Sequence, residues 1–398
     1  MTFDIPTMNV SEIVVVGGGP VGSVLALALR STKCKVTILE ARAKGASHND
    51  QRALALSYGS RVILEQLGVW SKLEAKATAI NTIHISQKGS FGRTKLDASE
   101  HNQSALGYVL AYGDLSAALD EALSSKQQVN VLYEATATNI KPAEAATTVT
   151  FTLDNAMQTL ASPLVVLADG GRSLEAIDGI TRETKEYGHD ALVTKVRCEL
   201  PHNNIAYERF TPMGPVALLP NGPRDFSLVW TGKQEAVAAL LALDDVTFLQ
   251  SLHHHFGDRM GRFLHVDKRM CFPLKMASLK PTFAQHLVVI GNAAQTMHPV
   301  AGQGFNVGLR DAWQLAELVR RGENTSDGAN LGSDSMLNAY QASRSQDTKR
   351  GLMFTDFLVN VFSNDIIGVS SGRAAALGVL DLVKPLKSHL VEKMSFGK

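Results

Sequence analysis

Three glycines near the start of the chain constrain its fold most strongly. Gly17, Gly19 and Gly22 follow directly after the apolar, β-branched run Ile13–Val16. The first glycine allows a tight turn out of a strand, the second lets a phosphate approach the backbone, and the third lets the following helix pack on the strand. The spacing therefore predicts a strand, a turn and a helix that begins near Pro20.

An acidic residue lies at the position where a strand, turn and helix of this kind use one to bind a ribose. A second apolar run ends at Glu40, roughly 20 residues after the last glycine, where a carboxylate accepts hydrogen bonds from both hydroxyls of an adenine ribose. The same carboxylate repels a 2′-phosphate, so we expect FAD or NAD here rather than NADP. The predicted contacts are Gly17, Gly19, Pro20, Val21, Gly22, Glu40 and Ala41. The three glycines alone would leave open a glycine-rich turn without a ligand.

A second glycine-containing segment lies far along the chain. Residues 291–311 read GNAAQTMHPVAGQGFNVGLRD and follow the apolar run LVVI. A helix that starts after Pro299 would turn the backbone N–H groups of residues 302–306 toward a negatively charged ligand edge. Paired with the first motif, this segment indicates a flavin. Its glycines lack the spacing of a second dinucleotide motif, so we expect NAD(P)H to bind only transiently.

Length and composition limit the alternatives. At 398 residues the chain is long enough for two domains. A net charge of +1 without a basic stripe argues against a nucleic-acid partner. Three well-separated cysteines indicate a reducing compartment, with no disulfide framework and no metal site. The first residues do not form a secretory signal and no run of apolar residues is long enough to span a bilayer, so a cytoplasmic location is expected.

The element pattern predicts an α/β protein in which an antiparallel sheet interrupts a mostly parallel, Rossmann-like nucleotide domain. We assign residues 1–75, 99–180 and 275–345 to a discontinuous FAD-binding domain, residues 76–98 and 181–274 to a substrate domain, and residues 346–398 to a C-terminal helical segment. Within the substrate domain we expect strands interrupted by one helix, over about 246–257.

Three motifs in this order carry a family resemblance. They are GGGPVG with Glu40, ADG at 168–170, and the segment from Gly291. The chain resembles the group A flavoprotein monooxygenases with the para-hydroxybenzoate-hydroxylase fold over nearly its whole length. The stretches DQRALALSYGS, ERFTPMGPVALLP, FSLVW and YQASRSQDTKR are most similar to the ubiquinone-biosynthesis hydroxylases, the group that includes 2-polyprenyl-6-methoxyphenol hydroxylase.

The resemblance implies an activity and its participants. It implies an FAD enzyme that uses NAD(P)H and O2, through a peroxyflavin, to hydroxylate the aromatic ring of a polyprenyl phenol in ubiquinone biosynthesis, and that contacts other proteins of that pathway. Two alternatives stay open: a flavin dehydrogenase or oxidase of the same fold, and a non-catalytic flavin-binding member of a lipid-biosynthetic complex. The oligomeric state is not predicted.

The resemblance also implies roles for single residues. Arg52 would lie over the flavin pyrophosphate or ring edge, with a solvated surface group as its alternative. Ala137 would touch adenine through its backbone, or be an ordinary strand residue. Asp169 would lie near the pyrophosphate and a bound nicotinamide nucleotide, or form a turn through its own side chain. The second segment would contribute Gly291, Asn292, Gly302, Gly304, Phe305 and Asn306.

Two positions in that segment are candidates for catalysis together with Arg52. These are His298, a potential base, and Pro299, beside which His298 has a purely structural alternative. The wider family carries Asp where this chain has Asn292. An amide oxygen accepts a ribitol hydroxyl without charge assistance, which lowers that bond from about 1.5–3 to about 0.5–1.5 kcal/mol. We therefore expect FAD to bind about tenfold more weakly. Ala111 also departs from the family pattern and suggests no role.

The substrate pocket is expected between the strand-rich insertion and the flavin. Its candidate lining is Phe210, Met213, Val216, Leu218 and Phe272, with plain sheet core as the alternative. The C-terminal stretch alternates apolar residues with Arg373, Lys384, Lys387 and Lys393, a pattern that suits contact with the inner membrane surface or a helix pair packed on the nucleotide domain. The triplet HHH at 253–255 is expected to be a solvated helix face.

Overall fold

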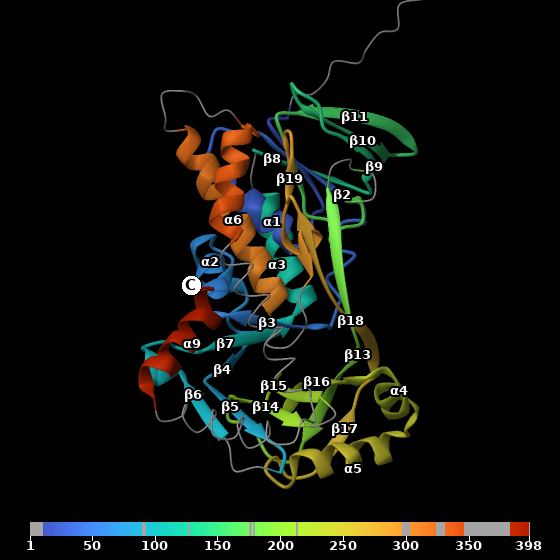
Figure 1. The fold of residues 1–398 in the computed structure, drawn as a ribbon, viewed down its shortest axis with the longest axis vertical. Coiled ribbons are helices and arrows are strands. Elements are labelled where there is room, and N and C mark those ends of the chain that lie inside the picture. Colours follow the sequence, from blue (N-terminus) through green and yellow to red (C-terminus); the bar gives the residue numbers. More distant parts are fainter. Residues whose placement is uncertain are drawn as a thin grey trace, which may run out of the picture.

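The computed structural model describes residues 11–89, 93–125, 128–174, 177, 180–211, 214–296, 303–323, 331–345 and 383–397. A six-stranded sheet with its helices occupies the upper half of the view in Figure 1, and a nine-stranded sheet occupies the lower half. The long strands β13 (Thr181–Cys198) and β18 (Met270–Lys280) run from one half to the other.

The six-stranded sheet is the nucleotide-type sheet that the glycine motif predicts. Its order is β19-β20-β12-β1-β2-β8, and all neighbouring pairs are parallel except β19 with β20. Strands β1, β2, β12 and β20 are buried along their whole length, which explains why they read as continuous apolar runs. The strands are β1 (Ile13–Val16), β2 (Val36–Glu40), β8 (Val129–Tyr133), β12 (Leu164–Leu167), β19 (Phe283–Ala284) and β20 (Leu287–Val289).

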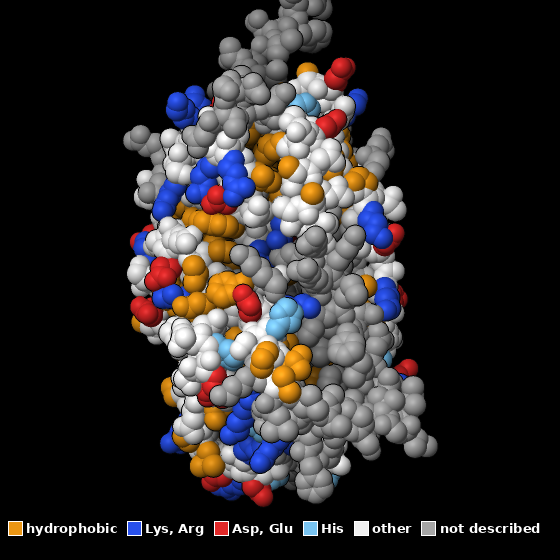
Figure 2. All heavy atoms as spheres, turned by 60° about the vertical axis from the view of Figure 1, so that its left-hand side comes forward, with side chains coloured by type: hydrophobic (Ala, Val, Ile, Leu, Met, Phe, Trp, Pro, Cys, Tyr) orange, Lys and Arg blue, Asp and Glu red, His pale blue; other side chains and the backbone are white. Residues whose placement is uncertain are grey.

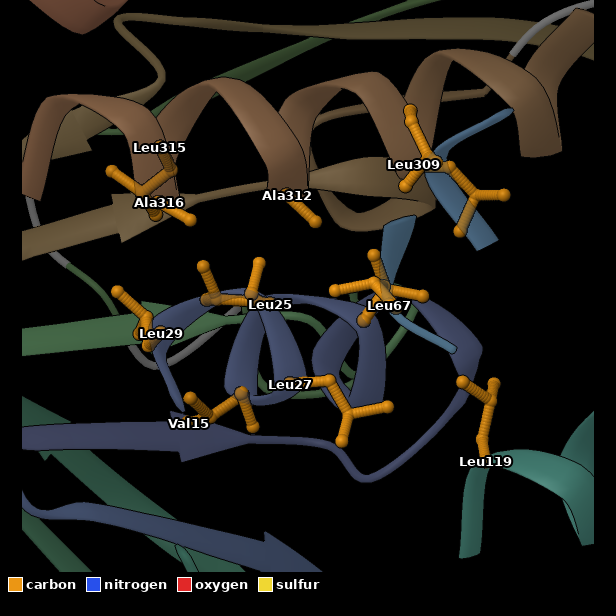
Figure 3. Close-up of a cluster of buried hydrophobic side chains, with 14 of the residues drawn as sticks. Val15, Leu25, Leu27, Leu29, Leu67, Leu119, Leu309, Ala312, Leu315 and Ala316 are labelled. Carbon is orange, nitrogen blue, oxygen red and sulfur yellow. The ribbon is translucent and has the colours of Figure 1, made fainter. Parts of the chain in front are cut away.

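Helix α1 (Pro20–Ala28) lies between this sheet and helix α6 (Gln303–Glu323). In Figure 3, Leu25 of α1 and Leu29, the residue that follows α1, point toward α6, whereas Leu27 of α1 points toward the β1 side. Because α1 is enclosed on both sides, almost its entire surface is apolar. Helices α2 (Tyr58–Gln66) and α3 (Tyr112–Ser124) contribute to the same core.

Two small sheets flank this core. One contains β9 (Thr136–Lys141), β10 (Thr147–Leu153) and β11 (Ala156–Ser162). The other has the order β3-β7-β4 and contains β3 (Ala53–Ser57), β4 (Thr78–Ile80) and β7 (Gly107–Ala111). This second small sheet lies between the nucleotide sheet and the nine-stranded sheet, because Ala53 and Val109 pack with Ala206 and Leu219 of the larger sheet.

The nine-stranded sheet has the order β21-β18-β13-β16-β15-β14-β5-β6, with β17 paired to β13. Helices α4 (Gln234–Ala242) and α5 (Asp245–Phe256) cover one face, and Phe226, Trp230 and Phe248 lie in the core between them. Helix α9 (Lys384–Phe396) packs by Val391 near the β5–β6 end. The remaining strands are β5 (Thr82–Gln87), β6 (Arg93–Asp97), β14 (Ile205–Thr211), β15 (Gly214–Pro220), β16 (Asp225–Lys233), β17 (Phe263–Val266) and β21 (Gln295–Thr296).

The predicted fold class is confirmed: a Rossmann-like sheet with helices is combined with an antiparallel-rich second sheet. The expectation of a single helix in residues 181–274 was wrong, because the described part of that stretch contains both α4 and α5. Helix α4 gives a weak start signal, since Lys233 at its N-cap makes no side-chain capping bond. The limits proposed for the domains stay a prediction.

The surface carries mixed charges. On the face shown in Figure 2, basic and acidic side chains are interspersed with hydrophobic ones, and the coloured part shows no continuous basic stripe. None of the helices in the described ranges combines the length and the apolar character that a bilayer crossing requires.

The α1–α6 contact provides a test of this core. Leu315 of α6 is completely buried, so Leu315→Ala leaves a cavity and is expected to lower the free energy of unfolding by about 2–5 kcal/mol. Leu264→Ala is the matched control because that side chain is 50% exposed, and a change below about 0.5 kcal/mol is expected. Urea denaturation of both variants measures the difference, and equal effects would contradict the packing described.

Candidate cofactor site

The glycine turn forms an open cradle at the start of α1. A Cβ on Gly22 would lie 2.1 Å from the carbonyl oxygen of Gly17, so the helix packs on the turn only because this side chain is missing. In front of Gly19 there is space, since a Cβ there would meet nothing closer than the Tyr112 hydroxyl at 3.8 Å. Gly19 is the N-cap of α1, with no side-chain cap and no acidic residue in the first turn. The helix N-terminus is therefore available to an anion.

Glu40 lies beside this cradle at the end of β2. Its carboxylate accepts hydrogen bonds from the backbone N–H of Gly18 at 2.8 Å and of Arg42 at 2.9 Å, and the Arg42 Nε donates at 2.7 Å. Burial raises the pKa of Glu40, but the hydrogen bonds from Arg42 and Gly18 outweigh it and lower the pKa. The group is therefore a carboxylate at neutral pH, as an acceptor for ribose hydroxyls must be.

A second arginine lies close to the cradle. Arg52 stacks over the ring of Tyr112 with 5.0 Å between the guanidinium carbon and the ring centroid, and its Nη2 pairs with Asp50 at 2.5 Å. The Tyr112 hydroxyl also faces Gly19, and beside Glu40, the larger cause, Tyr112 raises the pKa of Arg42. Two guanidinium groups and a helix N-terminus thus surround the same opening, which suits a pyrophosphate.

Asp169 follows β12 and lies against the glycine turn. Its Cα would be 2.7 Å from a Cβ on Gly17. The side chain accepts hydrogen bonds from the backbone N–H groups of Gly171 and Ser173, both at 2.8 Å. Asp169 therefore forms a turn through its own side chain, which was the alternative considered for it, and its contact with a cofactor stays a prediction. Ala137 is a half-buried residue of β9, and Ala41 is exposed after β2.

The second segment meets the first at Val21. Gly291 follows β20, and a Cβ on it would lie 3.2 Å from the Val21 side chain. A Cβ on Gly308 of α6 would lie 3.0 Å from the same side chain and 3.2 Å from the Gly291 Cα. A side chain at either position would therefore displace its neighbours by a few tenths of an ångström. The structure therefore brings the two remote segments together around the N-terminal end of α1, as their joint use by one flavin requires.

Asn306 ties α6 to the neighbouring small sheet. Its amide oxygen accepts hydrogen bonds from the Ser57 backbone N–H and the Ser60 hydroxyl, both at 2.8 Å, and its amide nitrogen donates to the Ala55 carbonyl at 2.9 Å. Only 2% of Asn306 is exposed. Its side chain holds β3 and α2 against α6, which leaves only its backbone for the predicted flavin contact.

The structure shows fewer contacts for the other residues that the sequence predicts in this segment. Asn292 is exposed in the short 3-10 helix Gly291–Ala293, and its side-chain amide makes no hydrogen bond with the described residues. Gly304 and Phe305 are half-buried in the first turn of α6. The predictions for His298, Pro299 and Gly302 lie outside the described residues.

Asp311 and Arg344 form a buried ion pair that sequence reasoning missed. The Asp311 carboxylate accepts from the Gly291 backbone N–H at 3.0 Å, from Gln295 Nε2 at 3.1 Å and from Arg344 Nε at 2.7 Å. Burial raises the pKa of Asp311 although Arg344 opposes this. Both residues lie in stretches whose resemblance was noted, GLRD and YQASR, but nothing in either stretch indicates that the two meet. Arg42 was also missed, although it stands two residues after the predicted ribose carboxylate.

The candidate substrate residues do not share one face. Val216 and Leu218 are completely buried in the core with α5. By strand alternation Phe210 is on the opposite face of the sheet, where it is 3% exposed. Phe272 is 43% exposed and pairs with Ala191, whose face is also opposite to this core. Met213 lies outside the described residues. The structure thus separates Val216 and Leu218 from the other two placed residues.

An open helix N-terminus, two arginines and an ionised ribose acceptor fit an adenine dinucleotide, and the second segment lies beside them at Val21. These features define the class of flavin-dependent oxidoreductases. When bound, FAD supplies the redox chemistry, which the side chains here do not provide.

Comparison with known proteins identifies the family. The model of the FAD binding domain family matches residues 10–355. The ubiquinone hydroxylase UbiL of Rhodospirillum rubrum is 34% identical over 95% of this chain and 88% of its own. The 3-demethoxyubiquinol 3-hydroxylase of Escherichia coli is 28% identical over 90% of this chain and 92% of its own. The p-nitrophenol 4-monooxygenase PnpA of Pseudomonas putida DLL-E4 shares the fold, with a TM-score of 0.77 at 16% identity over 97% of each chain.

The chain therefore belongs to the FAD binding domain family. It is an FAD-dependent monooxygenase of the aromatic-hydroxylase type that uses NAD(P)H, and the predicted family resemblance and cofactors are confirmed.

The ion pair below Gly291 gives the first test of the site. Arg344→Met leaves the Asp311 carboxylate buried without its cation, so we expect a loss of about 3–5 kcal/mol in the free energy of unfolding, together with weaker FAD retention. In the double variant Asp311→Asn, Arg344→Met, the amide still accepts from the Gly291 N–H and no charge is left buried, so most of the loss should be recovered. A single variant as stable as the native protein in urea would exclude this role.

Asn292 gives the second test. If its amide faces a ribitol hydroxyl, Asn292→Asp restores a charged acceptor and is expected to tighten FAD binding about tenfold. Fluorescence titration of the apoprotein with FAD measures this. Asn139→Asp is the control, because Asn139 is an exposed residue on β9. Equal dissociation constants for the native protein and Asn292→Asp would show that this side chain does not contact the cofactor.

Proposed function

We propose that this protein hydroxylates the aromatic ring of a polyprenyl phenol, 2-polyprenyl-6-methoxyphenol or a close relative, in ubiquinone biosynthesis, using NAD(P)H and O2. The observation that carries the proposal is the 34% identity to a protein named ubiquinone hydroxylase over 95% of this chain. The hydroxylase of Escherichia coli named for demethoxyubiquinol supports the same pathway.

The arrangement of the nine-stranded sheet supports an apolar aromatic substrate. Its face opposite to α4 and α5 carries a row of directly paired side chains, which we call the floor: Met270, Val193, Val229, Ala217, Glu208 and Ile85. All six are only partly buried by the described residues, and Ile85 also packs against the cluster that contains Val391 of α9. The other face is covered by its core. Five of the six side chains are apolar, which suits an aromatic ring with a prenyl chain.

The proposal assigns a binding or positioning role to each part of the cofactor site and to the floor. The N-terminus of α1, Arg42 and Arg52 would hold the pyrophosphate, and Glu40 would hold the adenine ribose. The start of α6 would favour negative charge on the flavin ring. The floor would position the phenol and exclude water. His298 and Pro299 remain proposed neighbours of the reacting groups, and Phe210 and Phe272 remain proposed neighbours of the substrate.

A polyprenyl substrate resides in a membrane, so the proposal includes transient contact with the inner membrane. Helix α9 supports it, because Leu386 and Phe396 are 48% and 37% exposed on a helix that also carries several lysines. Contact with other proteins of the pathway belongs to the same proposal.

The decisive experiment is anaerobic reduction of the FAD-loaded protein by NADPH and by NADH, each with and without a short-chain prenyl methoxyphenol. We expect the phenol to accelerate flavin reduction at least tenfold, and aerobic turnover with labelled dioxygen to place one labelled oxygen atom on the ring. A phenol that changes neither the rate nor the product would contradict the proposal. Rapid reduction that ignores the phenol would instead indicate a flavin dehydrogenase.

A further inference from the structure

Glu208 is the one charged residue of the floor. It pairs directly with Ala217 on one side and with Ile85 on the other. Its neighbours along β14, Tyr207 and Arg209, alternate to the opposite face, where Tyr207 belongs to the core under α4 and α5. The carboxylate therefore projects from the middle of an apolar surface.

Within the described part of the chain, this carboxylate has no partner. No hydrogen bond or ion pair joins it to any described residue. Burial alone raises the pKa of Glu208 to about 7. A carboxylate on an apolar surface without a donor is costly, and it is a common mark of a functional position in an enzyme cleft.

The floor lies close to the cofactor segment. On the same face as Glu208, Ala206 and Leu219 pack against Val109 and Ala53. Ala53 begins β3, and two residues later the Ala55 carbonyl accepts a hydrogen bond from Asn306 of α6. Two residues of a strand span about 7 Å. Ala206 stands two residues before Glu208 on β14, so one such step along β14 and one short piece of β3 separate Glu208 from the helix whose N-terminal turn belongs to the predicted flavin site.

We propose that Glu208 accepts the proton of the substrate's phenol hydroxyl. The proton passes from the phenol oxygen to a Glu208 carboxylate oxygen, so the carboxylate becomes a neutral acid and the substrate a phenolate, with no change in electron count. The neutral acid then donates a hydrogen bond back to the phenolate oxygen. A phenolate pushes electron density onto the ring carbons beside and opposite its oxygen, which selects the carbons that can be hydroxylated. This inference rests on the proposed function.

Among the described residues, the charged groups on the elements that pack near Glu208 are mostly paired. Arg52, next to Ala53, pairs with Asp50. Lys387 of α9, the helix that packs on the β5–β6 end, lies 3.8 Å from Glu100. Gln87, one step along β5 on the same face, is neutral. Arg209 is on the opposite face. The protonation of Glu208 therefore follows its apolar surroundings rather than a neighbouring charge.

The test compares binding of a short-chain prenyl methoxyphenol with binding of its methyl ether, which cannot donate a proton, to the FAD-loaded protein between pH 6 and pH 8.5. A Glu208 carboxylate accepts the hydroxyl only when ionised, so the native protein should prefer the phenol about tenfold at pH 8.5. That preference should fall as the pH drops through about 7. Ultraviolet absorbance of the bound ligand should show phenolate below the pH at which the free phenol ionises.

Glu208→Gln should bind both ligands with a ratio that does not change with pH, show no phenolate band, and lose the acid limb of the kcat/KM profile. Glu208→Asp should keep the pH dependence. Glu186→Gln is the matched control, since Glu186 is an exposed residue paired with Lys275, and it should behave as the native protein. Unchanged FAD content and melting temperature in each variant exclude misfolding.

The outcomes separate the two proposals. If the native protein hydroxylates the phenol and Glu208→Gln retains the same pH-dependent preference, the role of Glu208 is wrong and the proposed function stands. If the native protein neither binds the phenol nor responds to it during reduction, the proposed function fails, and the role of Glu208 fails with it.

Discussion

The close contact of Val21 with Gly291 and Gly308 is the constraint on which the site depends. The start of α1 has to approach the end of β20 and the first turns of α6, and side chains at these two glycines would push the segments apart. The α1–α6 interface then continues as tightly packed leucines and alanines. Because protein interiors transmit small displacements, this interface determines where the pyrophosphate end and the ring end of a dinucleotide lie relative to each other.

Two clusters of buried polar side chains, around Asn306 and around Asp311, fix the position of α6. Asn306 uses its donor and its acceptor on β3 and α2, and Asp311 connects the Gly291 backbone to Arg344. Each cluster costs desolvation that only complete pairing offsets. The clusters fix where the helix lies, since a shift of the helix would leave several buried groups without hydrogen-bond partners. The β3 strand held in this way also carries Ala53, which contacts the larger sheet, so the same clusters set the distance between the cofactor segment and the floor.

The sequence predicts the local parts of this site well. The glycine turn, the strand that ends at Glu40, the α/β class and the flavin family all follow from patterns within short stretches. It does not predict which distant residues meet. Asp311 and Arg344 are ordinary helix residues in sequence, and Arg42 has no signal beyond its proximity to Glu40. Helix α4 was missed because an apolar stretch without a capping side chain reads equally well as strand. The residue roles taken from the family, among them Arg52, Ala137 and Asn292, stay predictions.

The nine-stranded sheet shows why a pocket cannot be derived from apolar residues alone. Alternation along β15 places Val216 and Leu218 on one face and Ala217 and Leu219 on the other. Both sets are apolar, so the sequence does not reveal which face receives the helices α4 and α5. Charge in the sequence does not distinguish the faces either, because Glu208 and Arg209 are neighbours on β14 and alternate to opposite faces. A carboxylate placed against α4 and α5 would be sealed in a dry core, whereas on the floor it remains accessible to a ligand. The accessible face is therefore the one on which Glu208 can meet a polar group, here the hydroxyl of a mostly apolar molecule.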